Sequence, residues 1–251
     1  MKKYAQIFKE NNMNVYKIYN VGELLKENAY AGRGIVVGTT PDGKKAVSAY
    51  FIMGRSNNSR NRVFTEKDGA VYTEPFDASK VEDPSLIIYA AIRELDNKLI
   101  VTNGDQTDTI YDGVKSGKSF SDSLKVRCFE PDHPNLTPRI SAMLTFDNNS
   151  FGYQMSILKS IDELGSDCAR YTFDYPSVKG LGHFIHTYVC DGNPLPTFMG
   201  EPERIEVLDD IDDFTKLLWD NLNEENKISL YVRYTDLSTG AIEKRLINKN
   251  K

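Results

Sequence analysis

Apolar residues in this chain fall in short runs of strand length, separated by polar turns. Two of these runs, residues 34–40 and 45–53, are joined by a turn that contains Asp42 and Gly43. Asp-Gly between two β-branched runs is the strongest local signal for a hairpin, so the sequence predicts one here. By the same pattern we predict further strands at residues 98–102, 138–146, 151–157, 168–173, 183–190, 228–234 and 241–247.

Helical spacing occurs in fewer places. A helix is predicted for residues 83–95, where Pro84 suits the first helical position. The face of this helix would consist of Leu86, Tyr89, Ala90 and Arg93. The other predicted helices are residues 21–28, a segment that begins near Asp105 or Thr107, residues 119–124 and residues 214–222.

Strands in antiparallel hairpins, with helices in separate clusters, predict an α+β fold. We expect two mainly antiparallel sheets that pack face to face, with the helices on the outside. The chain shows no internal repeat and no low-complexity linker, so we expect a single domain over residues 1–251.

The composition narrows the functional classes. The net charge is −5, whereas nucleic-acid binders usually have a basic surplus, so we expect no nucleic-acid partner. No apolar run is long enough to span a membrane and none resembles a secretory signal, so we expect no membrane partner. The three cysteines are widely spaced, which suits a reducing, cytoplasmic location.

Arg55, Arg60 and Arg62 follow one predicted strand within eight residues of one another. A guanidinium group presents a planar fork of donors that fits phosphate oxygens. The cluster therefore predicts a site for a small anion. A solvated turn, with the arginines facing water, is equally consistent with this stretch alone.

Three more polar motifs stand at predicted element ends, where side chains can converge on a ligand. They are Tyr-Ala-Gly-Arg at residues 30–33, Asn-Gly-Asp at 103–105 and Thr-Pro-Arg at 137–139. Each motif also has a purely structural interpretation. Gly32 could end a helix, Asp105 could cap the start of one, and residues 137–139 could simply enter a strand.

Together these motifs resemble the archaeal-type inosine monophosphate (IMP) cyclohydrolases and their bacterial relatives. The resemblance rests on residues 30–33, 54–62, 87–93, 103–109 and 137–140, which occur in the family's order. Residues 1–29 would then be an N-terminal extension before the first family motif. Beyond residue 150 only the general pattern is similar.

The resemblance implies a four-layer αββα sandwich like that of the N-terminal nucleophile hydrolases. It also implies an enzyme of de novo purine biosynthesis, in which 5-formamidoimidazole-4-carboxamide ribotide (FAICAR) loses water to give IMP. Such hydrolases use an exposed terminal Thr, Ser or Cys as the nucleophile. This sequence starts with Met1 and Lys2, so we expect the fold without that chemistry. Ring closure needs no redox step or metal, so we expect no cofactor.

By the family motifs, Tyr89 and Glu130 would stand at the reacting centre. Tyr89 would donate a hydrogen bond to the formyl oxygen, and Glu130 would move the proton. If the match of this segment to the family motif is shifted, Asp132 takes this role in place of Glu130. Without the resemblance, Tyr89 would be interpreted as a core aromatic residue. The resemblance further implies substrate and phosphate binding by Arg33, Arg55, Arg60, Arg62, Asn103, Asp105 and Arg139.

Other functions compete with this one. His183, His186 and Cys190 could bind zinc, but strand positions three apart face opposite sides, so we expect no metal site. A non-catalytic or divergent relative that binds a purine ribotide is the main alternative. A nucleic-acid-binding module built on the arginines is disfavoured by the acidic balance. The expected partner is thus a small-molecule purine ribotide, and a homo-oligomer is compatible with the sequence.

Overall fold

The computed structural model describes residues 14–81 and 88–250. The strands of the first sheet are β1 (Arg33–Thr39), β2 (Lys45–Met53), β10 (Leu181–His186), β11 (Glu203–Glu206), β12 (Lys227–Asp236) and β13 (Ile242–Asn248). Those of the second sheet are β3 (Arg62–Lys67), β4 (Ala70–Pro75), β5 (Tyr89–Leu95), β6 (Lys98–Thr102), β7 (Arg139–Asp147), β8 (Ser150–Ser160) and β9 (Cys168–Pro176). The helices are α2 (Val21–Glu27), α3 (Asn57–Arg60), α4 (Gln106–Lys115), α5 (Phe120–Leu124) and α6 (Ile211–Asn221), with a 3-10 turn at Ala78–Lys80.

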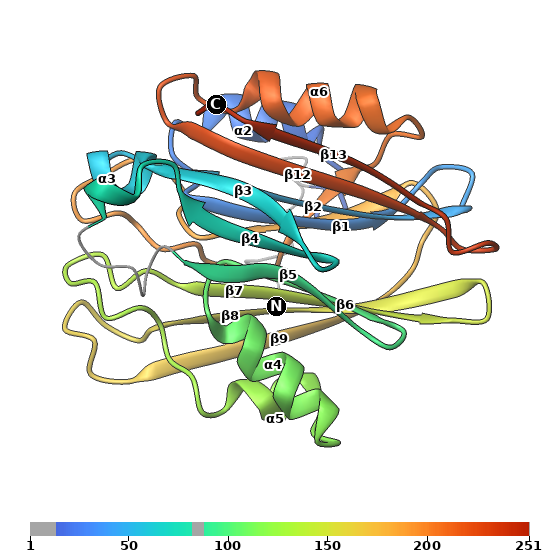
Figure 1. Cartoon of the computed structure of the whole chain (residues 1–251), viewed down its shortest axis with the longest axis horizontal. Helices are drawn as coiled ribbons and strands as arrows, with labels where there is room; N and C mark the ends of the chain where they lie inside the picture. The colour runs from blue at the N-terminus through green and yellow to red at the C-terminus, as the bar shows by residue number, and fades with distance from the viewer. Residues whose placement is uncertain (1–13, 82–87, 251) are drawn as a thin grey trace, which may run out of the picture.

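Both sheets are antiparallel throughout. The first has the order β11-β10-β1-β2-β12-β13, and the second runs β3-β4-β5-β6-β7-β8-β9. Figure 1 shows α2 and α6 over the first sheet, and α4 and α5 beneath the second. The expected α+β arrangement, two antiparallel sheets with helices outside, is confirmed.

Alternation along the strands builds the layers, because successive side chains point to opposite faces. Ile35 packs between the sheets, whereas its neighbour Val36 packs against the helical side with Phe214 of α6. In the second sheet, Val101 faces the other sheet and Ile100 packs against Ile110 of α4. Strands covered on both faces are apolar throughout, which is why they appear in the sequence as continuous apolar runs.

The predicted helix over residues 83–95 is wrong for the part that the structure describes. Tyr89–Leu95 is strand β5, which lies between β4 and β6. Its first four residues are all buried, so the helical spacing was a subset of a continuous apolar run. Pro84 and Leu86, on which the start of the helix was based, lie outside the described residues.

Some boundaries also differ from the prediction. The predicted strand over residues 183–190 ends at His186. The β3–β4 hairpin was missed, although its turn holds Asp68 and Gly69, the same Asp-Gly signal that marks the first hairpin. Both turn residues have positive φ, 51° and 77°, which explains why Gly occupies the second position.

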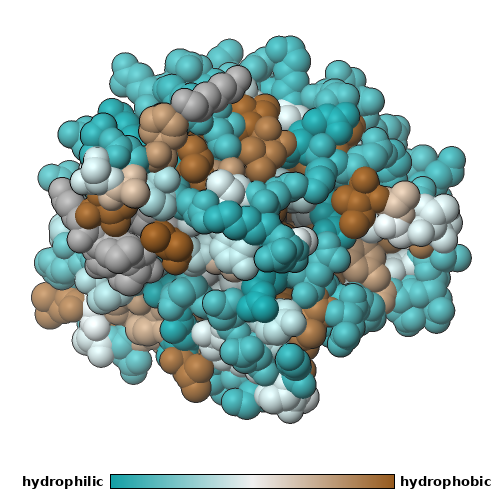
Figure 2. Space-filling model, in the orientation of Figure 1, coloured by the Kyte–Doolittle hydropathy of each residue, from teal (hydrophilic) through white to brown (hydrophobic). Residues whose placement is uncertain are grey.

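The described part of the predicted N-terminal extension packs on the first sheet. Tyr19 forms a parallel bridge with Ile205, and its N–H donates to the carbonyl of Arg204 at 2.9 Å. Residues 1–13 of the extension lie outside the described residues. The face drawn in Figure 2 is mostly hydrophilic, with apolar side chains in separate spots. In the part of the chain that the structure describes, no helix is long and apolar enough to cross a bilayer.

Candidate active site

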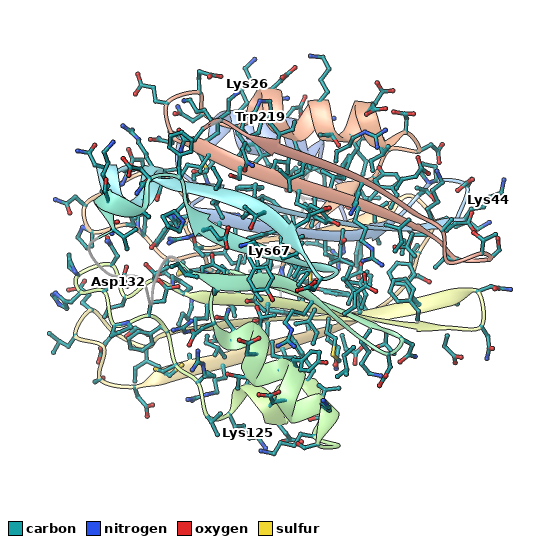
Figure 3. All side chains as sticks on the ribbon, viewed as in Figure 1. Lys26, Lys44, Lys67, Lys125, Asp132 and Trp219 are labelled. Atoms are coloured by element: carbon teal, nitrogen blue, oxygen red, sulfur yellow. The ribbon has the colours of Figure 1, made fainter. Side chains whose placement is uncertain are left out.

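Several predicted site residues stand at strand starts. They are the first residues of four strands: Arg33 of β1, Arg62 of β3, Tyr89 of β5 and Arg139 of β7. In the second sheet, β3, β5 and β7 alternate with strands of opposite direction. These three strands therefore run the same way, and their first residues lie at the same end of the sheet. Figure 3 locates the loop that leads into β7 by Asp132, at the end of the molecule opposite Lys44 in the β1–β2 turn.

Arg33 and Arg62 share one interior space. Arg62 is 2 % exposed, and burial together with the positive charge of Arg33 lowers its pKa. Burial alone would lower the pKa of Arg33, but the negative charge of Glu130 opposes it and the net direction is upward. The pKa of each guanidinium therefore depends on the charged groups around it.

The guanidinium groups of Arg33 and Arg62 have few hydrogen-bond partners within the protein. Nε of Arg62 donates to the carbonyl of Ser59 at 2.8 Å, while Nε of Arg33 is buried without a partner. Within residues 14–81 and 88–250, no hydrogen bond or ion pair engages the other guanidinium nitrogens of the pair. Because buried cations without partners are costly, this arrangement favours a bound anion.

Glu130 is a buried carboxylic acid beside this pair. It is 6 % exposed, and its backbone N–H donates to the carbonyl of Thr137 at 2.9 Å. Burial raises the pKa of Glu130, and the positive charges of Arg33 and Arg139 offset only part of that effect. A buried carboxyl with a raised pKa is suited to accept and return a proton near neutral pH.

The loop between β6 and α4 approaches Glu130 closely. A Cβ added to Gly104 would lie 2.6 Å from Nη1 of Arg139 and 3.6 Å from Oε1 of Glu130. The first distance is inside van der Waals contact, so a side chain at position 104 would displace the guanidinium of Arg139.

Tyr89 faces the same space from the second sheet. Its hydroxyl oxygen lies 3.0 Å from that of Tyr50 on β2. Burial lowers the pKa of Arg33, and the Tyr89 phenol is one of the weaker contributions, after Glu130, that raise it. Tyr89 thus lies on a strand and not on the predicted helix, and its hydroxyl meets that of Tyr50 between the two sheets. The structure thus brings together Arg33, Arg62, Tyr89 and Glu130.

Comparison with known proteins identifies the family. Residues 30–240 match the family model described as IMP cyclohydrolase-like protein. The chain belongs to this family. It is 32% identical over 165 residues to an IMP cyclohydrolase of Methanococcus aeolicus. This alignment covers 64% of this chain and 75% of that protein. It is also 32% identical over 125 residues to one of Methanopyrus kandleri, and 33% identical over 126 residues to one of Methanocaldococcus jannaschii. Each of these two alignments covers 49% of this chain and 61% of the relative.

The family resemblance expected from the motifs is therefore confirmed. The matched region of this IMP cyclohydrolase-like chain extends well past residue 150, although the motifs recognised in the sequence end near β7. The match includes β8 to β12 and helix α6.

In this IMP cyclohydrolase-like chain, Arg139 and Asp105 form an ion pair next to Gly104. Nη1 of Arg139 lies 2.7 Å from Oδ1 of Asp105 and donates to Oε1 of Gln106 at 2.8 Å. Arg127 pairs with the same Asp105. Burial alone would raise the pKa of Asp105, but the two arginines outweigh it and lower the pKa. Asp105 occupies the N-cap position of α4, as its structural interpretation predicts, but its side chain makes no capping hydrogen bond.

Asn103 holds two strand ends together. Its Nδ2 donates to the carbonyl of Pro138 at 2.9 Å, and its Oδ1 accepts from the N–H of Ile140 at 2.9 Å. These bonds fix the end of β6 against the start of β7. A contact between Asn103 and a ligand stays a prediction.

The other two arginines of the predicted cluster bind protein groups. Nη1 of Arg55 lies 2.5 Å from Oδ1 of Asp191, and its guanidinium lies 5.0 Å from the ring centre of Tyr30. Arg60 is exposed, and its Nε donates to the carbonyl of Gly54 at 3.1 Å. The three arginines therefore have different surroundings, and phosphate binding by Arg55 or Arg60 stays a prediction.

Two tyrosines beside Arg33, Tyr30 and Tyr188, have no role among the residues predicted from the sequence. Tyr30 and Tyr188 stack with ring centres 5.8 Å apart and an angle of 19° between the rings. Tyr30 opens the first family motif, so its position was a usable signal. Tyr188 lies beyond the recognised motifs, and nothing in its neighbourhood of the sequence separates it from a core aromatic residue.

The two histidines that could have formed a metal site face opposite sides of β10, as predicted. Nδ1 of His183 lies 2.6 Å from the hydroxyl of Tyr153 in the second sheet. His186 instead packs against Phe184, with its Nε2 3.3 Å from Glu203. One ion could not reach both imidazoles in this arrangement.

Proposed function

We propose that this protein closes the purine ring of FAICAR to give IMP with loss of water. Family membership supports the reaction, and the Arg33–Arg62 pair is the structural observation that carries it. A phosphate monoester would supply the negative charge that the two guanidiniums lack. The ribotide substrate carries such a group, and its base would extend toward Glu130 and Tyr89.

The proposed reaction needs a nucleophile, a proton acceptor and a proton donor. The carboxamide nitrogen attacks the formyl carbon while Glu130 accepts the N–H proton. Tyr89 donates a hydrogen bond to the formyl oxygen, where negative charge develops. Glu130 returns this proton to the oxyanion, which becomes a hydroxyl group. Glu130 then transfers the formamide N–H proton to this hydroxyl, so that the C–O bond breaks, water leaves and the ring C=N bond forms. Holding both substituents of the imidazole coplanar lowers the entropic part of the barrier.

We also propose that the layers seen here are the αββα sandwich of the N-terminal nucleophile hydrolases. The order of the layers in space supports this relationship: α2 and α6 cover the first sheet, the second sheet packs on its other face, and α4 and α5 cover the second sheet. The proton-transfer groups in our mechanism are internal side chains, so the fold would work without a terminal nucleophile. A single domain, a cytoplasmic location and a small-molecule ribotide as partner belong to the same proposal.

Incubation of the purified protein with FAICAR tests the activity, with formation of IMP followed by absorbance. We expect turnover in the wild type and loss of it in Glu130→Gln. Tight ribotide binding without turnover would support the non-catalytic alternative instead. Dialysis against a chelator should leave the rate unchanged. If zinc were needed to restore activity after dialysis, the metal-free mechanism would be wrong.

A further inference from the structure

Tyr188 lies outside the motifs by which the family was recognised, yet it is anchored to the first of them. It is 1 % exposed and follows the end of β10. Its N–H donates to the carbonyl of Ala31 at 3.2 Å, and its own carbonyl accepts from Nδ2 of Asn28 at 3.1 Å. The backbone of Tyr188 is therefore fixed to the segment that leads into β1 and Arg33.

The ring of Tyr188 is fixed as well. A Cβ added to Gly32 would lie 2.5 Å from its Cδ2, and Gly32 has a φ of +79°. Both facts require glycine at this position, because any side chain would clash with the ring and would strain the backbone. The opposing ring of Tyr30 stacks at 5.8 Å. The aromatic ring thus has little room to move beside Arg33.

The hydroxyl of Tyr188 reaches the loop that leads into β7 of the second sheet. It lies 2.6 Å from Oγ1 of Thr137, whose hydroxyl also bonds to Asp132. The N–H of Thr137 donates to Oδ1 of Asp132 at 2.6 Å, and the carbonyl of Thr137 accepts from the N–H of Glu130 at 2.9 Å. One residue, Thr137, therefore connects the Tyr188 phenol to the backbone of Glu130.

We propose that Tyr188 is a positioning residue that holds the loop of Glu130 in place against Arg33 of the first sheet. This inference rests on the proposed function, in which Glu130 moves the proton. Glu130 stands on a loop between α5 and β7, and a catalytic group on a loop needs a rigid support to stay in reach of the substrate. The buried phenol supplies that support from a strand end of the opposite sheet.

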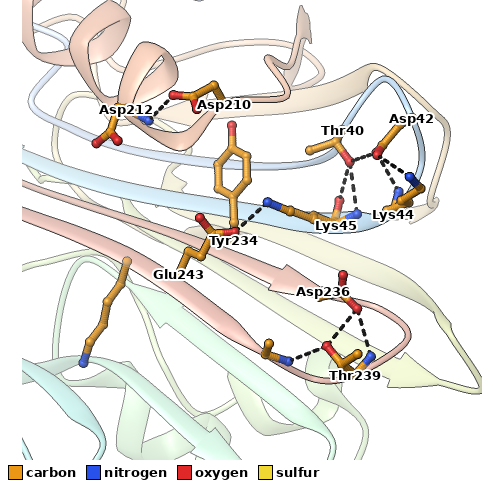
Figure 4. Close-up of polar contacts among 12 residues, drawn as sticks. Thr40, Asp42, Lys44, Lys45, Asp210, Asp212, Tyr234, Asp236, Thr239 and Glu243 are labelled. Carbon is orange, nitrogen blue, oxygen red and sulfur yellow. Dashed lines mark hydrogen bonds and ion pairs between the residues drawn. The ribbon is translucent and has the colours of Figure 1, made fainter.

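The first test compares Tyr188→Phe with Tyr234→Phe. Tyr234 is also a fully buried tyrosine of the first sheet, and its hydroxyl donates to the carbonyl of Leu208 at 2.8 Å. Figure 4 shows it beside Lys45 and Glu243, next to the β12–β13 turn. We expect kcat on FAICAR to fall about tenfold in Tyr188→Phe, the equivalent of one hydrogen bond, with KM within about twofold. Tyr234→Phe should lower only the melting temperature.

Substitutions of Thr137 test the connection itself. Thr137→Ser keeps the hydroxyl and should keep kcat, whereas Thr137→Val should lose at least as much as Tyr188→Phe. The double variant Tyr188→Phe/Thr137→Val should be no slower than Thr137→Val alone, because both changes remove one shared bond. If the two losses multiply, the proposed connection is wrong.

Amide hydrogen exchange tests the positioning without any turnover. In Tyr188→Phe, the Glu130 amide should exchange faster than in the wild type, and in Tyr234→Phe it should not. Unchanged protection in Tyr188→Phe, together with a normal kcat, would make Tyr188 a packing residue. If the wild type forms no IMP, the proposed function fails, and exchange at Glu130 still decides whether Tyr188 holds the loop.

Discussion

Glu130 illustrates the cost of placing a proton-transfer group inside the protein. Its pKa is raised above the ordinary 4.5, with burial as the main cause. A carboxyl whose pKa is higher in the folded than in the unfolded state stabilises the fold when protonated. That stabilisation is present below the unfolded pKa and is lost as the pH rises through the folded pKa. Above the unfolded pKa, the burial of Glu130 therefore reduces stability.

We predict that Glu130→Gln loses activity and gains stability. Turnover should fall about 10²- to 10⁴-fold, the range for a lost proton acceptor. The melting temperature at pH 7 should rise, because the amide removes the cost of the buried charge. Below pH 4.5, where the wild-type carboxyl is protonated, the difference in melting temperature should shrink. A variant that melts lower than the wild type at pH 7 would show that Glu130 is stabilised by its arginines.

Tyr89 and Tyr50 allow a matched pair of substitutions, since each removes the same buried hydrogen bond from one side. We predict that Tyr89→Phe lowers kcat about 10²- to 10³-fold, the effect of losing one donor to a developing oxyanion. Tyr50→Phe should retain most of the activity, because Tyr50 contributes only to the pair. Steady-state kinetics and thermal melts of both variants measure this difference. Equal losses of stability with normal turnover in both would assign Tyr89 to the core alone.

At the scale of elements, β10 places a titratable group between the sheets. His183 bonds to Tyr153 and stacks on the ring of Tyr175 with centres 3.6 Å apart. Burial, with a smaller effect from the positive charge of Arg204, lowers the pKa of His183 to about 4. The folded protein thus keeps this imidazole neutral, whereas the unfolded chain protonates it near pH 6.5.

This difference predicts an acid-sensitive fold. A lowered folded pKa contributes stability that is present above pH 6.5 and is lost as the pH falls toward 4. Urea unfolding at several pH values should show this decline in the wild type. His183→Gln, which cannot titrate, should be less stable at pH 7 but should lose less stability on acidification. A wild-type slope that the variant retains in full would assign the decline to other groups.

The elements also show where the sequence is informative. Turn chemistry predicted the β1–β2 hairpin, and the same Asp-Gly signal was present at Asp68 and Gly69 of the missed β3–β4 hairpin. Periodicity failed at β5, because a strand buried on both faces has no polar side from which to count. The site residues on family motifs could be named in advance. Tyr188 could not, since its role depends on contacts with Gly32 and Thr137 that are distant in sequence.

At the scale of the whole molecule, the proposed site joins the two sheets. Arg33 comes from the first sheet, while Arg62, Tyr89 and Arg139 come from the second. The sequence could indicate these residues but not that Arg33 and Arg62 come close enough to shift the pKa of Arg62. A ligand bound between them would contact both sheets, so its binding should stabilise the entire fold.

We therefore predict that IMP raises the melting temperature and that inosine, which lacks the phosphate, does so much less. Ligand at about 100 times its Kd stabilises a protein by about 2.7 kcal/mol. Arg33→Met should remove most of this effect, since one charged contact to phosphate contributes about 1.5–3 kcal/mol. Without ligand, the same variant should be less stable than the wild type, because Glu130 then loses the positive charge that offsets its burial.

Arg245→Gln provides the control for this measurement. Arg245 pairs with Asp212 of α6, on the outer side of the first sheet, and its side chain is 39% exposed. The variant should respond to IMP as the wild type does. If Arg33→Met also keeps the full response, or if inosine and IMP stabilise the protein equally, the phosphate is not held by the Arg33–Arg62 pair. The ribotide would then have to bind in another orientation or at another place.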